Sequence, residues 1–144
     1  MTAADARGGD QPLGYDVAVE PGPEFLRITF TGEFSVPRTL RAFDTVAGEA
    51  ARHAASKVLL DARGVVGIPS ESQQYEVGRY VAAHVPFKLS LVEHPARRSY
   101  FGEWVATSGG ANVRLFTEEA RAIAWLVRTG SDSEKTAPPD GDRP

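Results

Sequence analysis

Two short segments near the start of the chain have the hydrophobic pattern of strands. Residues 15–20 alternate between apolar and polar side chains, and residues 25–31 are rich in β-branched and aromatic residues. Both patterns are typical of half-buried strands. Because residues 21–24 between them are rich in proline and glycine, we expect an antiparallel hairpin with a short turn.

Apolar residues at helical spacing, in steps of three and four, recur four times in the rest of the chain, separated by short strand-like runs. The expected elements are helices from Ser35 to about residue 54, over residues 70–84, over residues 97–109 and from Thr117 onward, with strands over residues 57–61, 87–92 and 112–116. The order β-β-α-β-α-β-α-β-α, with short connections, predicts an α/β fold with a single mixed, mostly parallel sheet.

The continuous apolar run over residues 58–60 is typical of a central strand that is buried on both faces. We expect Asp61 to end this strand and residues 62–69 to form a loop. The aromatic face of the third helix, over residues 100–104, either packs against the sheet or lines a lipid pocket. Trp125 is expected at the edge of the last helix.

Composition indicates one folded domain. The chain has 144 residues, of which 42% are hydrophobic, and this suffices for one core. Residues 1–12 and 131–144 contain almost no large apolar side chains, so we expect both ends to be disordered, the second as an acidic tail. The predicted domain therefore covers residues 13–130.

Charge and residue usage exclude several classes of protein. The net charge is −3, whereas nucleic-acid binders carry a basic excess. The absence of cysteine excludes disulfide scaffolds, thiolate zinc sites and a cysteine nucleophile. No run approaches the about 18 apolar residues of a membrane span, and the first residues lack the apolar segment of a signal peptide. We therefore expect a cytoplasmic protein that binds no nucleic acid and has no membrane span.

The order of elements resembles the STAS domain of bacterial anti-sigma-factor antagonists. The chain is also similar to the SpoIIAA-like branch of that family, which is grouped with SEC14-like lipid-binding folds. The resemblance covers about residues 15–128, and residues 58–72 carry it most clearly. In the antagonists, the matching stretch is a buried strand ending in Asp, followed by Asp-Ser-Ser-Gly at the start of a helix. Aligned without a gap, Asp61 matches the strand-end Asp, and Ser70 matches the serine that a partner kinase phosphorylates.

Ser70 has two interpretations. The resemblance makes it a candidate phosphorylation position, but Pro69 replaces the expected Asp, and Glu71-Ser72 replaces Ser-Gly. Ser70 followed by Gln73 also fits a capping box, in which the two residues satisfy each other's backbone amides. A phosphate at a helix N-terminus is compatible with the same position. We favour the cap and expect no working phosphoswitch.

A candidate ligand or partner surface is predicted where polar residues follow parallel strands or begin helices, because α/β sheets bind ligands beyond the carboxyl ends of their strands. Each residue also has a purely structural interpretation, such as an acceptor for loop amides or an arginine projecting into water. The candidates are Asp61, Arg63, Ser72, His94, Arg97 and Arg98.

The sequence gives little support for an enzyme. It contains no phosphate-binding glycine loop, nucleophile elbow or metal-ligand spacing, so we predict no catalytic residue, metal or cofactor. The resemblance implies a non-catalytic regulatory domain that binds a protein partner, and it leaves a homodimer open. The alternative is a binding module for a small apolar or anionic ligand, as SEC14-like kinship would imply.

Overall fold

The computed structural model describes residues 14–97 and 100–128. The two ends that the sequence predicts to be disordered, residues 1–12 and 131–144, lie outside the described residues, as does the candidate Arg98. The elements are β1 (Asp16–Pro21), β2 (Leu26–Glu33), α2 (Val36–Arg52), β3 (Lys57–Val66), α3 (Glu71–His84), β4 (Lys88–Val92), the short 3₁₀ helix η1 (Pro95–Arg97), α4 (Tyr100–Ser108), β5 (Val113–Phe116) and α5 (Glu119–Val127). Their order confirms the predicted one, with η1 added.

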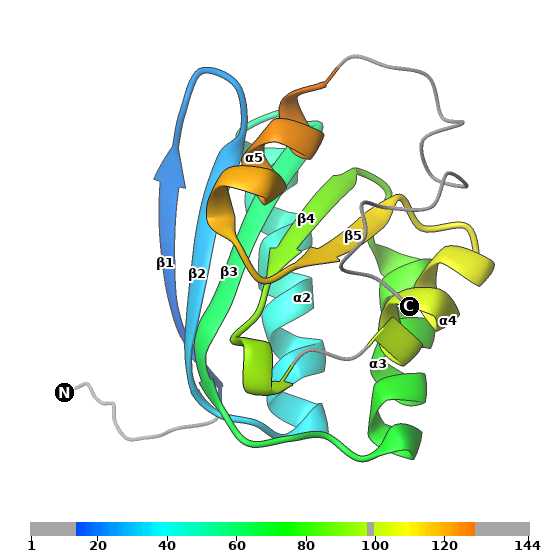
Figure 1. Ribbon diagram of the computed structural model, residues 1–144. Coiled ribbons are helices and arrows are strands. Elements are labelled where there is room, and N and C mark those ends of the chain that lie inside the picture. The colour runs from blue at the N-terminus through cyan, green and yellow to red at the C-terminus, as the bar shows by residue number, and fades with distance from the viewer. Residues whose placement is uncertain (1–13, 98–99, 129–144) are drawn as a thin grey trace, which may run out of the picture.

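All five strands form one sheet in the order β1-β2-β3-β4-β5. β1 pairs antiparallel with β2, and every other neighbouring pair is parallel, so the predicted mixed sheet is confirmed. α5 lies on one face of the sheet, and α2, α3 and α4 lie on the other (Figure 1). β3 is the middle strand, between two parallel neighbours.

Successive residues of β3 point to opposite faces of the sheet and belong to different hydrophobic cores. Leu60 joins the larger core, with α2, α3 and α4. Leu59 joins the smaller core, with α5. Both side chains are fully buried. The predicted central position of this strand is confirmed.

The predicted end of β3 is wrong. The strand continues from Asp61 through residues 62–66, because the long β2 strand supplies pairing partners as far as Glu33. Gly64 suggested a loop in the sequence, but it lies in the strand where a Cβ would come within 2.7 Å of the Thr31 side chain. A glycine inside a strand is typical of such a close approach.

Four expectations about the helices are also corrected. α4 begins at Tyr100 rather than 97, after the separate turn η1. Its Trp104 is 63% exposed, because α4 turns Val105 and Ala106 toward the core instead. Trp125 is buried against Phe116 rather than at the edge of α5. The N-cap of α5 is Glu118, not Thr117, and it makes no side-chain capping bond.

Truncation of Leu60 tests the position of β3. Leu60→Ala removes a fully buried side chain and is expected to lower the free energy of unfolding by about 2–5 kcal/mol, the range for large-to-small changes in a packed core. Chemical denaturation measures this loss. Ala124→Gly, at an exposed position of α5, is the control and should cost about 1 kcal/mol through helix propensity alone. A smaller loss for Leu60→Ala than for the control would contradict the topology.

Candidate functional site

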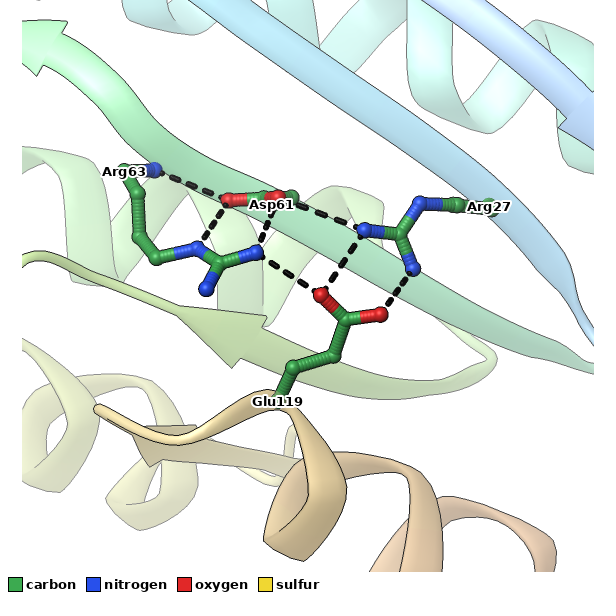
Figure 2. Close-up of polar contacts among 4 residues, drawn as sticks. All are labelled: Arg27, Asp61, Arg63 and Glu119. Atoms are coloured by element: carbon green, nitrogen blue, oxygen red, sulfur yellow. Dashed lines mark hydrogen bonds and ion pairs between the residues drawn. The ribbon is translucent and has the colours of Figure 1, made fainter.

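Two of the predicted site residues, Asp61 and Arg63, lie in a four-residue ion cluster on the α5 face of the sheet (Figure 2). The Arg63 guanidinium donates to both Asp61 oxygens, at 2.9 and 2.7 Å, and the Arg63 backbone amide donates to Asp61 Oδ1 at 3.1 Å. Arg27 of β2 binds Glu119 of α5 through two hydrogen bonds of 2.7 and 3.0 Å. Arg63 also donates to Glu119 at 2.7 Å, and Arg27 donates to Asp61 at 3.4 Å.

The ion cluster holds two positive and two negative side chains, so its formal charge is zero. Hydrogen bonding from Arg63 lowers the pKa of Asp61, although burial acts in the opposite direction. Hydrogen bonding from Arg27 similarly lowers the pKa of Glu119. Both carboxylates are therefore ionised and paired near neutral pH. The arrangement joins the first turn of α5 to β2 and β3, and it leaves no carboxylate free for acid–base chemistry.

Sequence reasoning missed Arg27 and Glu119 as members of this cluster. Arg27 stands between Leu26 and Ile28, which face the larger core, so its side chain has to face the other side of the sheet. Glu119 lies in the first turn of α5, where an acidic residue is favourable for the helix dipole even without a partner. The sequence could have indicated this contact, because an interior strand of an α/β sheet is covered on both faces. An arginine on such a strand therefore needs a charged partner from the helix that covers it.

Ser70 forms the predicted capping box at the start of α3. Its hydroxyl accepts from the Gln73 amide at 3.2 Å, and the Gln73 side chain accepts from the Ser70 amide at 2.8 Å. The Ser70 hydroxyl also lies 3.3 Å from that of Ser72. The cap is thus confirmed as a structural feature, while the suggested phosphorylation of Ser70 stays a prediction.

Exposed apolar side chains flank this cap in the sequence. Val66 ends β3 and is 66% exposed, Ile68 in the connection to α3 is 72% exposed, and Tyr75 of α3 is 47% exposed. We call Val66, Ile68, Ser72 and Tyr75 the β3–α3 surface. Gly67 within it has a φ of +117°, a backbone conformation that favours glycine, and this fixes the turn that presents Ile68.

The other described residues of the predicted surface, Ser72, His94 and Arg97, do not join Asp61 and Arg63 in the ion cluster. Arg97 ends η1, where its Nε donates to the Gly67 carbonyl at 2.5 Å and its guanidinium pairs with Glu93. His94 is exposed, and its Nδ1 accepts from the Ala96 amide at 3.0 Å, a local turn contact. The predicted single surface is therefore divided between the ion cluster, the β3–α3 surface and the η1 turn.

A cavity of about 120 Å³ lies between the sheet and the helices of the larger core. Most of its wall is aliphatic or aromatic. Its charged wall residues include Glu93, directly after β4, and Arg97. Representative lining residues are Phe43, Leu60, Val77, Leu91, Glu93 and Ala106. The predicted aromatic face of α4 does not line this cavity, because Gly102, Glu103 and Ala106 of that helix do so instead.

Glu93 is the strongly perturbed acid of this region. Burial raises its pKa to about 7, although the neighbouring Arg97 guanidinium acts in the opposite direction. The two side chains retain exposed fractions of 15% and 9%, so the pair lies close to the protein surface. A buried acid with a charge partner beside a cavity is a feature that binding sites share.

Within residues 14–97 and 100–128, no group of three His, Cys, Asp or Glu side chains is placed to hold a metal ion. In the same residues, no helix combines the length and the apolar character needed to cross a membrane.

Replacement of Asp61 tests the ion cluster. Asp61→Asn leaves Arg63 and Arg27 without one of their two carboxylates, and we expect a loss of about 1–3 kcal/mol in the free energy of unfolding at neutral pH. Because the folded-state pKa of Asp61 is lowered, its contribution is complete above the ordinary carboxyl pKa of about 4 and disappears as the pH falls further. Urea denaturation across this pH range measures both effects.

The difference between wild type and Asp61→Asn isolates this carboxylate from the other acids. It should shrink as the pH falls below about 4. Asp16→Asn, at an exposed position of β1, is the matched control and should change stability by less than about 0.5 kcal/mol. A difference that stays constant at acidic pH would contradict the ionised pairing of Asp61.

Comparison with known proteins shows the fold. No protein-family model matches the chain, and no curated protein matches its sequence. The crystal structure of an anti-sigma factor antagonist from Mycobacterium paratuberculosis aligns with a TM-score of 0.56 at 13% identity, over 81% of this chain and 97% of that one. A DUF3478-family protein with a SpoIIAA-like fold from Shewanella loihica PV-4 aligns over the same shares with a TM-score of 0.44 at 13% identity. The first match shows that this chain has the STAS/SpoIIAA-like fold that its element order implied.

Proposed function

We propose that this chain is a non-catalytic regulatory domain of the cytoplasm that binds a protein partner through the β3–α3 surface. Its fold is shared with an anti-sigma factor antagonist, a name that describes action on another protein. The observation that carries the proposal is a group of exposed apolar side chains that lie close together in the sequence. Of the four large hydrophobic residues that stand out as exposed in the described chain, Val66, Ile68 and Tyr75 lie within ten residues of sequence.

This clustering supports partner binding because exposed apolar residues normally occur singly on a protein surface, whereas groups of them mark interaction sites. The backbone on both sides of Ile68 is held in a fixed conformation. The Arg97 side chain binds the carbonyl of Gly67 immediately before it, and the capped first turn of α3 begins after Pro69, the residue that follows it. A preorganised apolar residue loses little conformational freedom on binding, which favours affinity.

The geometry also supports a non-catalytic role without a phosphoswitch. Asp61, the acid that the family resemblance singled out, is paired with two arginines, and its lowered pKa makes it a poor proton donor near neutral pH. The Ser70 hydroxyl already accepts from the Gln73 amide. A structural cap accounts for this serine without a kinase.

Two experiments at position 68 test the partner surface: photo-cross-linking, which identifies the partner, and substitution of Ile68 by a charged residue, which tests its binding. A photo-reactive amino acid at position 68 should cross-link one protein in an extract of the native cell, whereas the same probe at the exposed Ala124 on the opposite face should not. With that protein purified, Ile68→Asp should weaken binding at least tenfold because it places a charge in an apolar contact. Ala124→Asp adds the same charge elsewhere and should bind within twofold of wild type. Equal binding by both variants, or no specific cross-link at position 68, would refute the proposed surface.

Two substitutions of Ser70, measured with the same purified partner, separate the cap from a phosphoswitch. Ser70→Ala should lower the free energy of unfolding by about 0.5–2 kcal/mol, while Ser70→Asp should be nearly neutral because Asp also caps helices well. We expect both variants to bind the partner as wild type does. If Ser70→Asp keeps its stability but loses a partner that Ser70→Ala retains, Ser70 is a regulated position and the proposal of an inactive phosphoswitch fails.

A further inference from the structure

The cavity beside α3 and α4 is larger than ordinary packing explains. Protein interiors leave few voids bigger than a water molecule, whereas this one measures about 120 Å³. The close approach of α3 to α4 accompanies this space. A Cβ on Gly78 of α3 would lie 2.8 Å from the Gly102 carbonyl of α4 and 2.9 Å from Val105. The two helices therefore pack on each other at a residue without a side chain, and the space between them and the sheet stays open.

The wall of the cavity combines an apolar surface with one ion pair and the side chain of Glu103. Leu60 and Leu91 of the sheet, Phe43 of α2 and Val77 of α3 contribute apolar side chains. The paired Glu93 and Arg97 contribute a carboxylate and a guanidinium. Ligand pockets are typically apolar with a small number of placed polar groups. A charged pair in such a wall is costly to desolvate and adds little to stability compared with apolar packing.

We infer that this cavity is a binding site for a small, uncharged molecule that has an apolar ring and one hydroxyl group, with the hydroxyl placed beside the Glu93–Arg97 pair. The inference concerns a site apart from the β3–α3 surface and does not depend on the proposed function. Of the two ligand classes that the sequence left open, apolar and anionic, the cavity favours the apolar one.

The size of the cavity sets the size of the ligand. An engineered cavity of about 150 Å³ in another protein binds benzene, so about 120 Å³ accepts a ligand of similar size, particularly where its polar end reaches the near-surface ion pair. Longer lipid chains exceed this volume.

The ion pair sets the chemistry of the ligand. A hydroxyl both donates and accepts hydrogen bonds, so it can donate to the Glu93 carboxylate and accept from the Arg97 guanidinium. A carboxylate has about four acceptor positions, and the bond from Arg97 uses one of them. When Glu93 is ionised, it and Arg97 have no net charge, and Glu103 adds a negative charge to the same wall. An anionic ligand would therefore bring an uncompensated negative charge into a largely buried site, which is unfavourable.

Phenol is the probe for this site, with benzoate as its anionic counterpart of similar size. Titration of the full chain, followed by amide chemical shifts, should give saturable changes at residues lining the cavity, including Leu91, Glu93 and Ala106. We expect a phenol dissociation constant on the order of 0.1–1 mM, which is reasonable for so few atoms, and binding of benzoate at least tenfold weaker. No saturable change up to about 10 mM, changes that map to Trp104 or Tyr75 instead, or equal binding of benzoate would overturn the inference.

Two variants locate the probe. Leu91→Phe adds volume at a half-buried position of the cavity wall and should weaken phenol binding at least tenfold. Ile123→Phe makes a comparable change at a half-buried position of the α5 core and should bind within twofold of wild type. Retained amide shift dispersion shows that each variant is folded. If Leu91→Phe binds phenol as wild type does, the cavity is not the site.

A third variant tests the role of the charge pair. Glu93→Gln leaves Arg97 without its carboxylate partner and removes one negative charge from the wall. Benzoate binding should then improve at least tenfold relative to wild type, because the ligand supplies the missing negative charge. An unchanged preference for phenol over benzoate would show that Glu93 does not select the ligand and would overturn that part of the inference.

Discussion

The structure depends on the burial of both faces of the central strand β3. Leu59 and Leu60 are adjacent in sequence and both fully buried, yet they belong to different cores on opposite faces of the sheet. A strand in this position requires helices on both faces, since an apolar face left in water would be strongly unfavourable. Among the described elements, α5 covers one face near β3, and α2, α3 and α4 cover the opposite face (Figure 1).

The helices on the two faces of the sheet are attached to it in different ways. α5 is held at its first turn by the ion cluster around Asp61, and near its end by Lys88, whose ammonium donates to the Trp125 carbonyl at 2.8 Å. The opposite face is packed less completely and contains the cavity. Arg97 contacts both candidate functional regions, because it pairs with Glu93 in the cavity wall and binds the Gly67 carbonyl beside the exposed Ile68.

The fold could be predicted from the sequence because apolar periodicity, caps and turn residues all act locally. The buried run at residues 58–60 and the capping box of Ser70 and Gln73 are of this kind. The course of β3 beyond Asp61 could not be predicted, since it depends on pairing with β2, a contact distant in sequence. The ion cluster required the same long-range knowledge, because Arg27 and Glu119 come from opposite ends of the domain. The cavity depends on how closely two helices approach, which periodicity does not encode.

Hydrogen exchange of individual backbone amides is the most direct test of β3 as the central constraint. An amide in the middle of this strand, such as that of Leu60, should exchange only through global unfolding, so its free energy of opening should equal that from denaturation. Amides of the edge strand β1 should open at lower free energy. If the Leu60 amide exchanged faster than those of β1, or through a local opening that left the other elements folded, β3 would not be the strand on which the two cores depend.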